Sequence, residues 1–209
     1  MRIHGRGWLL AAALAVGCKK GDEPKAAYQS GFAHQMKGEY DAALHDYDRA
    51  LAVKPDLALA LKNRGRTHFY LGQFGESAKD LAAGLRYDST NGFVVVWLHM
   101  ARQRQGEADS TELAANAARI DPAKWPGPVA RLYLGKSSIA ALDSTAEVGN
   151  AQALRVQRCG AAFYVGVMQI WTKQLPEART RLERARAICP HDWSEYQGAV
   201  AELGRIGAG

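Results

Sequence analysis

Histidine and cysteine are the residues of this 209-residue chain that could most readily support catalysis or bind a metal. The sequence contains no His-Glu-x-x-His, Gly-x-Ser-x-Gly or phosphate-binding P-loop spacing. His45 and His99 have no ligand-type residue four positions later, where a second ligand would share the same helix face. The pattern therefore predicts no enzymatic activity, no metal site and no cofactor.

Three other histidines favour structural roles. His34 and His68 stand 34 residues apart, in equivalent positions of two successive repeats that an aromatic or apolar residue normally holds. His191 follows a proline and precedes Asp192, an ordinary helix-capping residue. We therefore expect packing or capping roles for these histidines.

The N-terminal residues 1–17 have the layout of a secretory signal peptide. Arg2 and Arg6 form a basic start, and an apolar run follows from Trp8 to Val16. This run is about half of the ~20 residues that a membrane-spanning helix needs. The segment is therefore interpreted as a cleaved signal and not as a permanent transmembrane anchor.

The segment Leu14–Cys18 resembles a bacterial lipobox, with Gly17 directly before the cysteine. The resemblance implies cleavage after Gly17, a diacylglycerol on the Cys18 thiol and a lipidated tether over residues 18–24. Lys19 follows the cysteine, which in enterobacterial lipoproteins implies sorting to the outer membrane. The alternative is an ordinary cleaved signal whose cysteine is incidental.

A period of 34 residues organises the rest of the chain. The first copy contains Gly31, Gly38, Tyr40, Ala43, Tyr47, Ala50 and Pro55. The second copy, in register, contains Gly65, Gly72, Phe74, Ser77, Leu81, Gly84 and Ser89. Small residues at fixed slots let two helices cross closely, and a turn glycine accepts a positive φ. This period is typical of the tetratricopeptide repeat (TPR), a stacked helix-turn-helix unit.

Two further copies are visible beyond the second. The third contains Trp97, Leu98, Gly106, Ala115, Ala118 and Pro122, with a one-residue slip in its turn, and the fourth contains Gly166, Leu175, Ala178, Leu182, Ala185 and Pro190. Trp125, Pro126 and Pro128 interrupt the pattern between them, where we expect a degenerate pair of short helices over residues 129–134 and 137–142.

The predicted fold is all-α, a right-handed superhelical TPR solenoid over residues 25–206 that ends in a capping helix. The expected units are repeats at about 24–57, 58–91 and 92–124, a degenerate helical pair at 125–158, a repeat at 159–192 and a cap at 193–206.

The net charge of +6 raises nucleic acid as a possible partner. Removing residues 1–17, which hold two of the 27 basic residues and none of the 21 acidic ones, leaves a net charge of +4. The remaining charges alternate in sign at helical pairing distances, as in Glu177 with Arg181 and Glu183 with Arg186. This pattern favours a solvated helix face, and we expect no nucleic-acid partner.

The first helix of each repeat should line a concave binding groove. Side chains at i, i+4 and i+7, with their flanking positions, predict a protein-binding groove formed by Tyr28, Phe32, Gln35, Lys62, Asn63, Arg66, Phe69, Tyr70, Trp97 and Arg104. Aromatic and arginine side chains dominate interface energetics. The alternative for each single residue, Trp97 above all, is that it fills the core between repeats.

The lipobox, the repeats and the C-terminal half together resemble the NlpI-type lipoproteins of Gram-negative bacteria over residues 26–206. The residues that carry this resemblance are Trp97, Leu98, Ala101, Gln103, Leu132, Tyr133, Leu134, Gly135, Phe163, Tyr164, Gly166, Glu195, Tyr196, Glu202 and Leu203. The resemblance implies an outer-membrane lipoprotein facing the periplasm that docks peptidoglycan hydrolases and a periplasmic protease. Family members also form homodimers through N-terminal helices, but the segment before the first repeat is very short here.

The function expected from these features is that of a non-enzymatic, lipid-anchored adaptor for proteins of the cell envelope. The alternatives are a general TPR protein-binding module in another envelope process, or a cell-wall hydrolase.

Cys159 and Cys189 are expected to form a disulfide. They occupy the first slot of the fourth repeat and the slot before its closing proline, and antiparallel helices bring those slots to the same end. Their α-carbons could then lie within the roughly 4.4–6.8 Å that a disulfide requires, and the periplasm would oxidise the pair. The alternative is two independent buried thiols.

Overall fold

The computed structural model describes residues 23–207, so the predicted signal peptide, Cys18 and the tether up to residue 22 lie outside the described residues. The described part contains eleven helices and no strand. They are α1 (Glu23–Met36), α2 (Tyr40–Val53), α3 (Ala58–Tyr70), α4 (Phe74–Tyr87), α5 (Gly92–Gln105), α6 (Ser110–Ala117), α7 (Gly127–Tyr133), α8 (Ile139–Thr145), α9 (Ala151–Trp171), α10 (Leu175–Ile188) and α11 (Ser194–Gly207). The predicted all-α class is confirmed.

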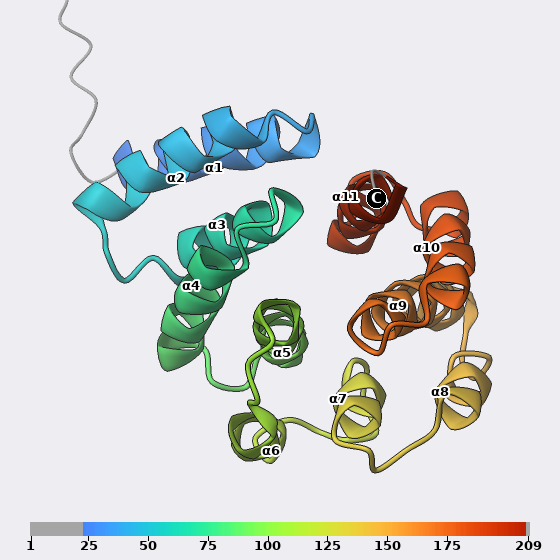
Figure 1. The fold of residues 1–209 in the computed structure, drawn as a ribbon. Helices are drawn as coiled ribbons and strands as arrows, with labels where there is room; N and C mark the ends of the chain where they lie inside the picture. Colours follow the sequence, from blue (N-terminus) through green and yellow to red (C-terminus); the bar gives the residue numbers. More distant parts are fainter. Residues whose placement is uncertain (1–22, 208–209) are drawn as a thin grey trace, which may run out of the picture.

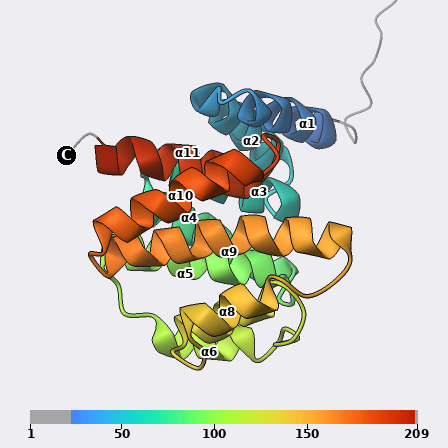
Figure 2. The same cartoon turned by 90° about the vertical axis from the view of Figure 1, so that its right-hand side faces the viewer.

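Consecutive helices pack against each other, as in proteins built from helical repeats. The most extensive contacts join α1 with α2, α3 with α4, and α9 with α10. The chain then follows a curved path, and α11 returns to contact α3 (Figure 1). Seen from the side, α9, α10 and α11 lie next to one another on the face of the molecule toward the viewer (Figure 2). Among the described helices, none is long and apolar enough to cross a membrane.

Small residues at the expected slots explain why the paired helices approach closely. A Cβ atom added to the glycine would lie within 3 Å of a large side chain sixteen residues later in three pairs: Gly31 with Tyr47, Gly65 with Leu81 and Gly166 with Leu182. The turn glycines Gly38 and Gly72 have φ angles of 78° and 77°, which other residues rarely adopt. The periodic glycines therefore stabilise each helix pair separately: some let its two helices approach closely, and others allow the turn between them.

Several helix boundaries differ from those expected from the sequence, those of α7 and α8 by up to three residues. α1 includes Glu23 and Pro24, which the sequence assigned to the tether, because proline is tolerated in the first turn of a helix. α9 begins at Ala151, eight residues before the predicted start of the fourth repeat. The side chain of Asn150 accepts a hydrogen bond from the amide of Ala153, which caps the longer helix.

Two clusters of buried apolar side chains form the core. The smaller cluster joins α1, α2 and α3, where Tyr47 is surrounded by alanine and leucine side chains. The larger cluster runs from α3 to α11 and includes Phe69, Trp97, Phe163 and Leu182. The backbone of Gly198 in α11 lies so close to Phe163 and Trp97 that an added Cβ would clash with the Phe163 ring at 2.6 Å. The helix predicted as a cap thus packs on α9 and α10 and also on the first half of the chain.

Candidate binding cavity

Three residues of the predicted groove lie in the core. Phe69 and Trp97 are completely buried, and Tyr70 is 4% exposed. The Trp97 ring packs against Phe69, Tyr70 and Phe163, with centroid distances of 5.1, 5.8 and 5.3 Å. The expectation that these side chains face a binding partner is wrong, because α9 and α11 cover them.

Two basic residues of the predicted groove are held by internal ion pairs. Arg104 donates to both carboxylate oxygens of Glu202, whose side chain is completely buried. The Nζ atom of Lys62 lies 3.1 Å from the carboxylate of Asp88, at the end of α4. Arg104 and Lys62 therefore join parts of the chain to each other, which corrects their assignment to the groove.

The remaining residues of the predicted groove lie together at the junction of the two halves. A cavity of about 350 Å³ is lined by Phe32, Gln35, Met36, Asn63, Arg66, Phe93, Val156, Asp192, Trp193, Ser194 and Glu195. Four of these belong to the predicted groove, and Tyr28 lies next to them, because its hydroxyl accepts a hydrogen bond from Asn63 at 3.1 Å. The cavity is thus built from α1, α3, α5, α9 and the start of α11.

The sequence pattern does not predict the side of the cavity that the second half of the chain contributes. Trp193, Ser194 and Glu195 lie about 130 positions after Asn63 and outside the repeat pattern. Glu195 was noticed as part of the family resemblance, but no local spacing connects it with the first helices. Only the return of α11 to α3 brings these residues to the cavity.

Arg66 supplies the positive charge of the cavity. One of its terminal nitrogens donates to the side-chain oxygen of Asn63 at 3.3 Å, and its buried Nε atom has no hydrogen-bond partner among the described residues. Its guanidinium carbon lies 5.8 Å from the centre of the Trp97 ring. Within residues 23–207, no carboxylate lies within 4 Å of this guanidinium. Burial raises the pKa of the neighbouring Tyr28 hydroxyl, and the Asn63 hydrogen bond and the charge of Arg66 oppose this rise.

Glu195 supplies a negative charge to the cavity lining. Its carboxylate accepts hydrogen bonds from the Tyr164 hydroxyl at 2.7 Å and from the Ser194 hydroxyl at 3.1 Å. The residue is 7% exposed, and no cationic side chain of the described chain lies within 4 Å of it. Burial and the nearby Glu195 carboxylate keep the pKa of Tyr164 well above its usual value, so Tyr164 remains a hydrogen-bond donor.

Gln35 holds the floor of the cavity in place. Its side-chain oxygen accepts hydrogen bonds from the hydroxyls of Tyr47 and Thr67, at 2.7 and 3.1 Å. Its backbone carbonyl accepts a third from the side chain of Gln197 at 3.2 Å. These bonds join α1, α2, α3 and α11 at the floor of the cavity.

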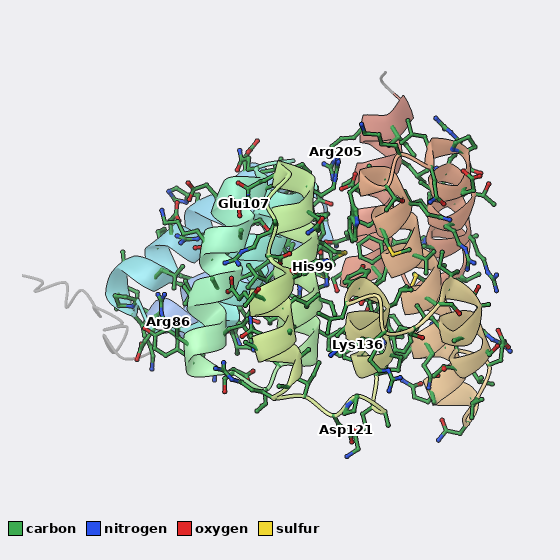
Figure 3. The ribbon with its side chains drawn as sticks, turned by 60° about the horizontal axis from the view of Figure 1, so that its bottom comes forward. Arg86, His99, Glu107, Asp121, Lys136 and Arg205 are labelled. Atoms are coloured by element: carbon green, nitrogen blue, oxygen red, sulfur yellow. A yellow bond between two sulfur atoms is a disulfide. The ribbon has the colours of Figure 1, made fainter. Side chains whose placement is uncertain are left out.

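Three histidines, none of which lines this cavity, contact partners near helix ends. His34 contacts Glu39 at 2.5 Å and His68 contacts Gln73 at 2.6 Å, in equivalent positions of successive helix pairs. His99 lies on α5 (Figure 3), with its ring 2.8 Å from the Asp109 carboxylate. In the part of the chain that the structure describes, no three His, Cys, Asp or Glu side chains gather as metal ligands would.

Cys159 of α9 and Cys189 after α10 form the predicted pair. Their sulfur atoms lie at disulfide distance and their α-carbons are 5.0 Å apart. Both residues are buried. The predicted pairing agrees with this geometry.

The cavity combines apolar walls with an arginine, two carboxylates, a hydroxyl and two amide side chains. Such a lining can hold an apolar group and orient it through a few polar contacts. No model of a known protein family matches the sequence.

Proposed function

We propose that this chain is a TPR scaffold that binds partner proteins without catalysing a reaction. In this proposal the helix pairs form a right-handed superhelix, and the protein belongs with NlpI-type lipoproteins that recruit cell-wall hydrolases and a periplasmic protease. The observation that supports it best is the cavity at the junction of α1, α3 and α11, which has mixed polar and apolar walls on a helical-repeat frame. Such a surface suits the recognition of a peptide segment better than chemistry.

The proposed location is the periplasmic face of the outer membrane, with lipid on Cys18. The leader and the lipobox-like segment motivate this location. The buried Cys159–Cys189 pair supports it, because disulfides persist in oxidising compartments such as the periplasm. Each buried methylene of an acyl chain adds about 0.8 kcal/mol of membrane affinity, so the three chains typical of mature bacterial lipoproteins would hold the protein firmly.

Fractionation of a Gram-negative host tests the anchor. The Cys18→Ser variant should leave the membrane fraction, whereas Cys159→Ser, which keeps the lipidation site, should remain there. Retention of Cys18→Ser in the membrane would contradict lipidation at this residue.

Affinity capture tests the adaptor role. The tagged full chain is isolated from detergent-solubilised envelope, and the bound proteins are identified by mass spectrometry. A cell-wall hydrolase or a periplasmic protease should be enriched over a capture from untagged cells. Recovery of ribosomal or cytosolic proteins alone would refute the proposal, and so would peptidoglycan turnover by the stringently purified protein.

A further inference from the structure

The cavity between α1, α3 and the start of α11 presents two opposite charges that the described chain leaves without ion-pair partners. Arg66 and Glu195 both line it, and neither has an oppositely charged side chain within 4 Å among residues 23–207. We propose that this cavity binds a peptide segment in which one bulky apolar side chain lies between an acidic and a basic residue. This inference rests on the proposed function, because it assumes that the ligand is part of a protein.

Arg66 is the residue that would bind the acidic side chain of the segment. The guanidinium lines the cavity and is partly buried, and among residues 23–207 its one side-chain hydrogen bond goes to a neutral amide, so its charge has no ion-pair partner there. A carboxylate is the natural acceptor, because it can bond two nitrogens of one guanidinium. Asn63 accepts a hydrogen bond from one terminal nitrogen of Arg66, which restrains the guanidinium before a ligand binds.

Glu195 is the residue that would bind the basic side chain of the segment. Two hydroxyls donate to its carboxylate, so the charge is oriented but not neutralised. Asp192, exposed nearby on the same cavity, adds a second negative charge. A ligand with two acidic groups would therefore be repelled from this wall, whereas a lysine or arginine would be attracted to it.

The apolar residues of the cavity would contact the bulky side chain of the segment. Phe32, Met36, Phe93, Val156 and Trp193 surround the polar groups, and Phe32 is 41% exposed. A volume of about 350 Å³ lies near the lower end of the roughly 300–1,000 Å³ that ligand sites span. The cavity therefore suits a short extended segment and is too small for a helix.

Blocked tripeptides test the proposal directly. The probes are Ac-Glu-Phe-Lys-NH2 and the reversed Ac-Lys-Phe-Glu-NH2, titrated into the full chain in detergent. The Met36 methyl resonance, assigned through Met36→Leu, reports binding, and the buried Met100 methyl serves as the internal reference. At least one order should bind, and replacing Phe with Gly or both charged residues with Gln should weaken it at least tenfold.

A charge exchange separates recognition from structural damage. Arg66→Glu should prefer Ac-Lys-Phe-Lys-NH2 over both mixed-charge peptides, a reversal that unfolding cannot produce. Arg86→Glu, an exposed arginine on α4, is the matched control and should keep the original preference. Arg66→Gln, which introduces no new charge, should bind Ac-Glu-Phe-Lys-NH2 and Ac-Gln-Phe-Lys-NH2 equally well.

Two outcomes would overturn the inference: neither mixed-charge peptide shifts the Met36 methyl resonance, or Arg66→Glu keeps the peptide preference of Arg86→Glu. If the envelope capture still recovers a hydrolase or protease in that case, the inference alone fails. If the capture also recovers no such enzyme, the proposed function fails with it.

Discussion

The helix pair α1–α2 and the helices α9–α11 lie near opposite ends of the chain and are held by different kinds of contact. The polar contacts within α1–α2 are mostly local, such as His34 with Glu39 and Arg49 with Asp46. α11 instead reaches helices of the first half, through Glu202 to Arg104 and through Arg205 to the carbonyl of Tyr70. In Figure 3, Arg205 lies between the two halves of the molecule.

The difference shows that α11, at the C-terminal end, makes contacts that connect distant parts of the chain. The small α1–α2 cluster packs on one neighbouring pair, whereas the larger cluster extends from α3 to α11. A change in the contacts of α11 should therefore affect the whole fold, and a change in an outer ion pair should stay local. The following predictions test this contrast.

The largest effect is expected for Glu202→Ala. The substitution leaves Arg104 without its buried carboxylate, and breaking a buried ion pair costs about 3–5 kcal/mol of the free energy of unfolding. Urea denaturation followed by circular dichroism measures this loss. Glu76→Ala, which removes an exposed glutamate of α4, is the control and should leave stability almost unchanged. Equal effects of the two substitutions would contradict the special role of α11.

A slightly smaller loss is expected when both disulfide cysteines are replaced by alanine. A bridge that closes a loop of 30 residues should contribute about 3–4 kcal/mol by restricting the unfolded chain. Chemical denaturation of the double variant measures the contribution. Thiol labelling of the denatured, unreduced protein checks the premise, since two reactive groups in the mature body, with Cys18 blocked, would show that no bridge exists.

A moderate, pH-dependent effect is expected at the Asp109–His99 pair. Burial raises the pKa of Asp109, but the hydrogen bond and charge of His99, together with the hydrogen bond of Gln103 and the charge of Arg102, outweigh it, so the folded pKa lies below the usual 3.8. The stabilisation is therefore complete above pH 3.8 and is lost as the pH falls from there through the lower folded pKa. Denaturation curves from pH 6 to pH 2 should show a steeper acid loss for the wild type than for Asp109→Asn. Glu107→Gln, at an exposed neighbour, should follow the wild type.

The smallest effect is expected for Asp88→Asn. This substitution weakens the pair with Lys62, in which the Asp88 side chain is 36% exposed. Exposed and half-exposed ion pairs contribute about 0–1 kcal/mol, because water screens them. Urea denaturation should therefore show a loss several times smaller than that of Glu202→Ala. A loss as large as that of Glu202→Ala would remove the contrast between the two regions.

The sequence by itself determined the helix pairs and the turns between them, and it predicted that Cys159 and Cys189 lie close together. These features depend on contacts within one repeat, such as Gly65 against Leu81, so the 34-residue spacing carries the information. The irregular pair α7–α8 was also recognisable, because prolines and tryptophan interrupt the period before it. The start of α9 was not, because an asparagine cap extended the helix beyond the repeat boundary.

Only the tertiary structure decided which groove residues stay accessible. Arg104 and Glu202 are separated by 98 positions, and no local pattern pairs them. Their contact brings α11 over Phe69 and Trp97, which the repeat pattern alone would leave facing a partner. The same packing brings Glu195 and Arg66 to the lining of one cavity. A one-dimensional repeat specifies each pair of helices, but the closure of the array depends on side chains that meet only after the chain has curved back.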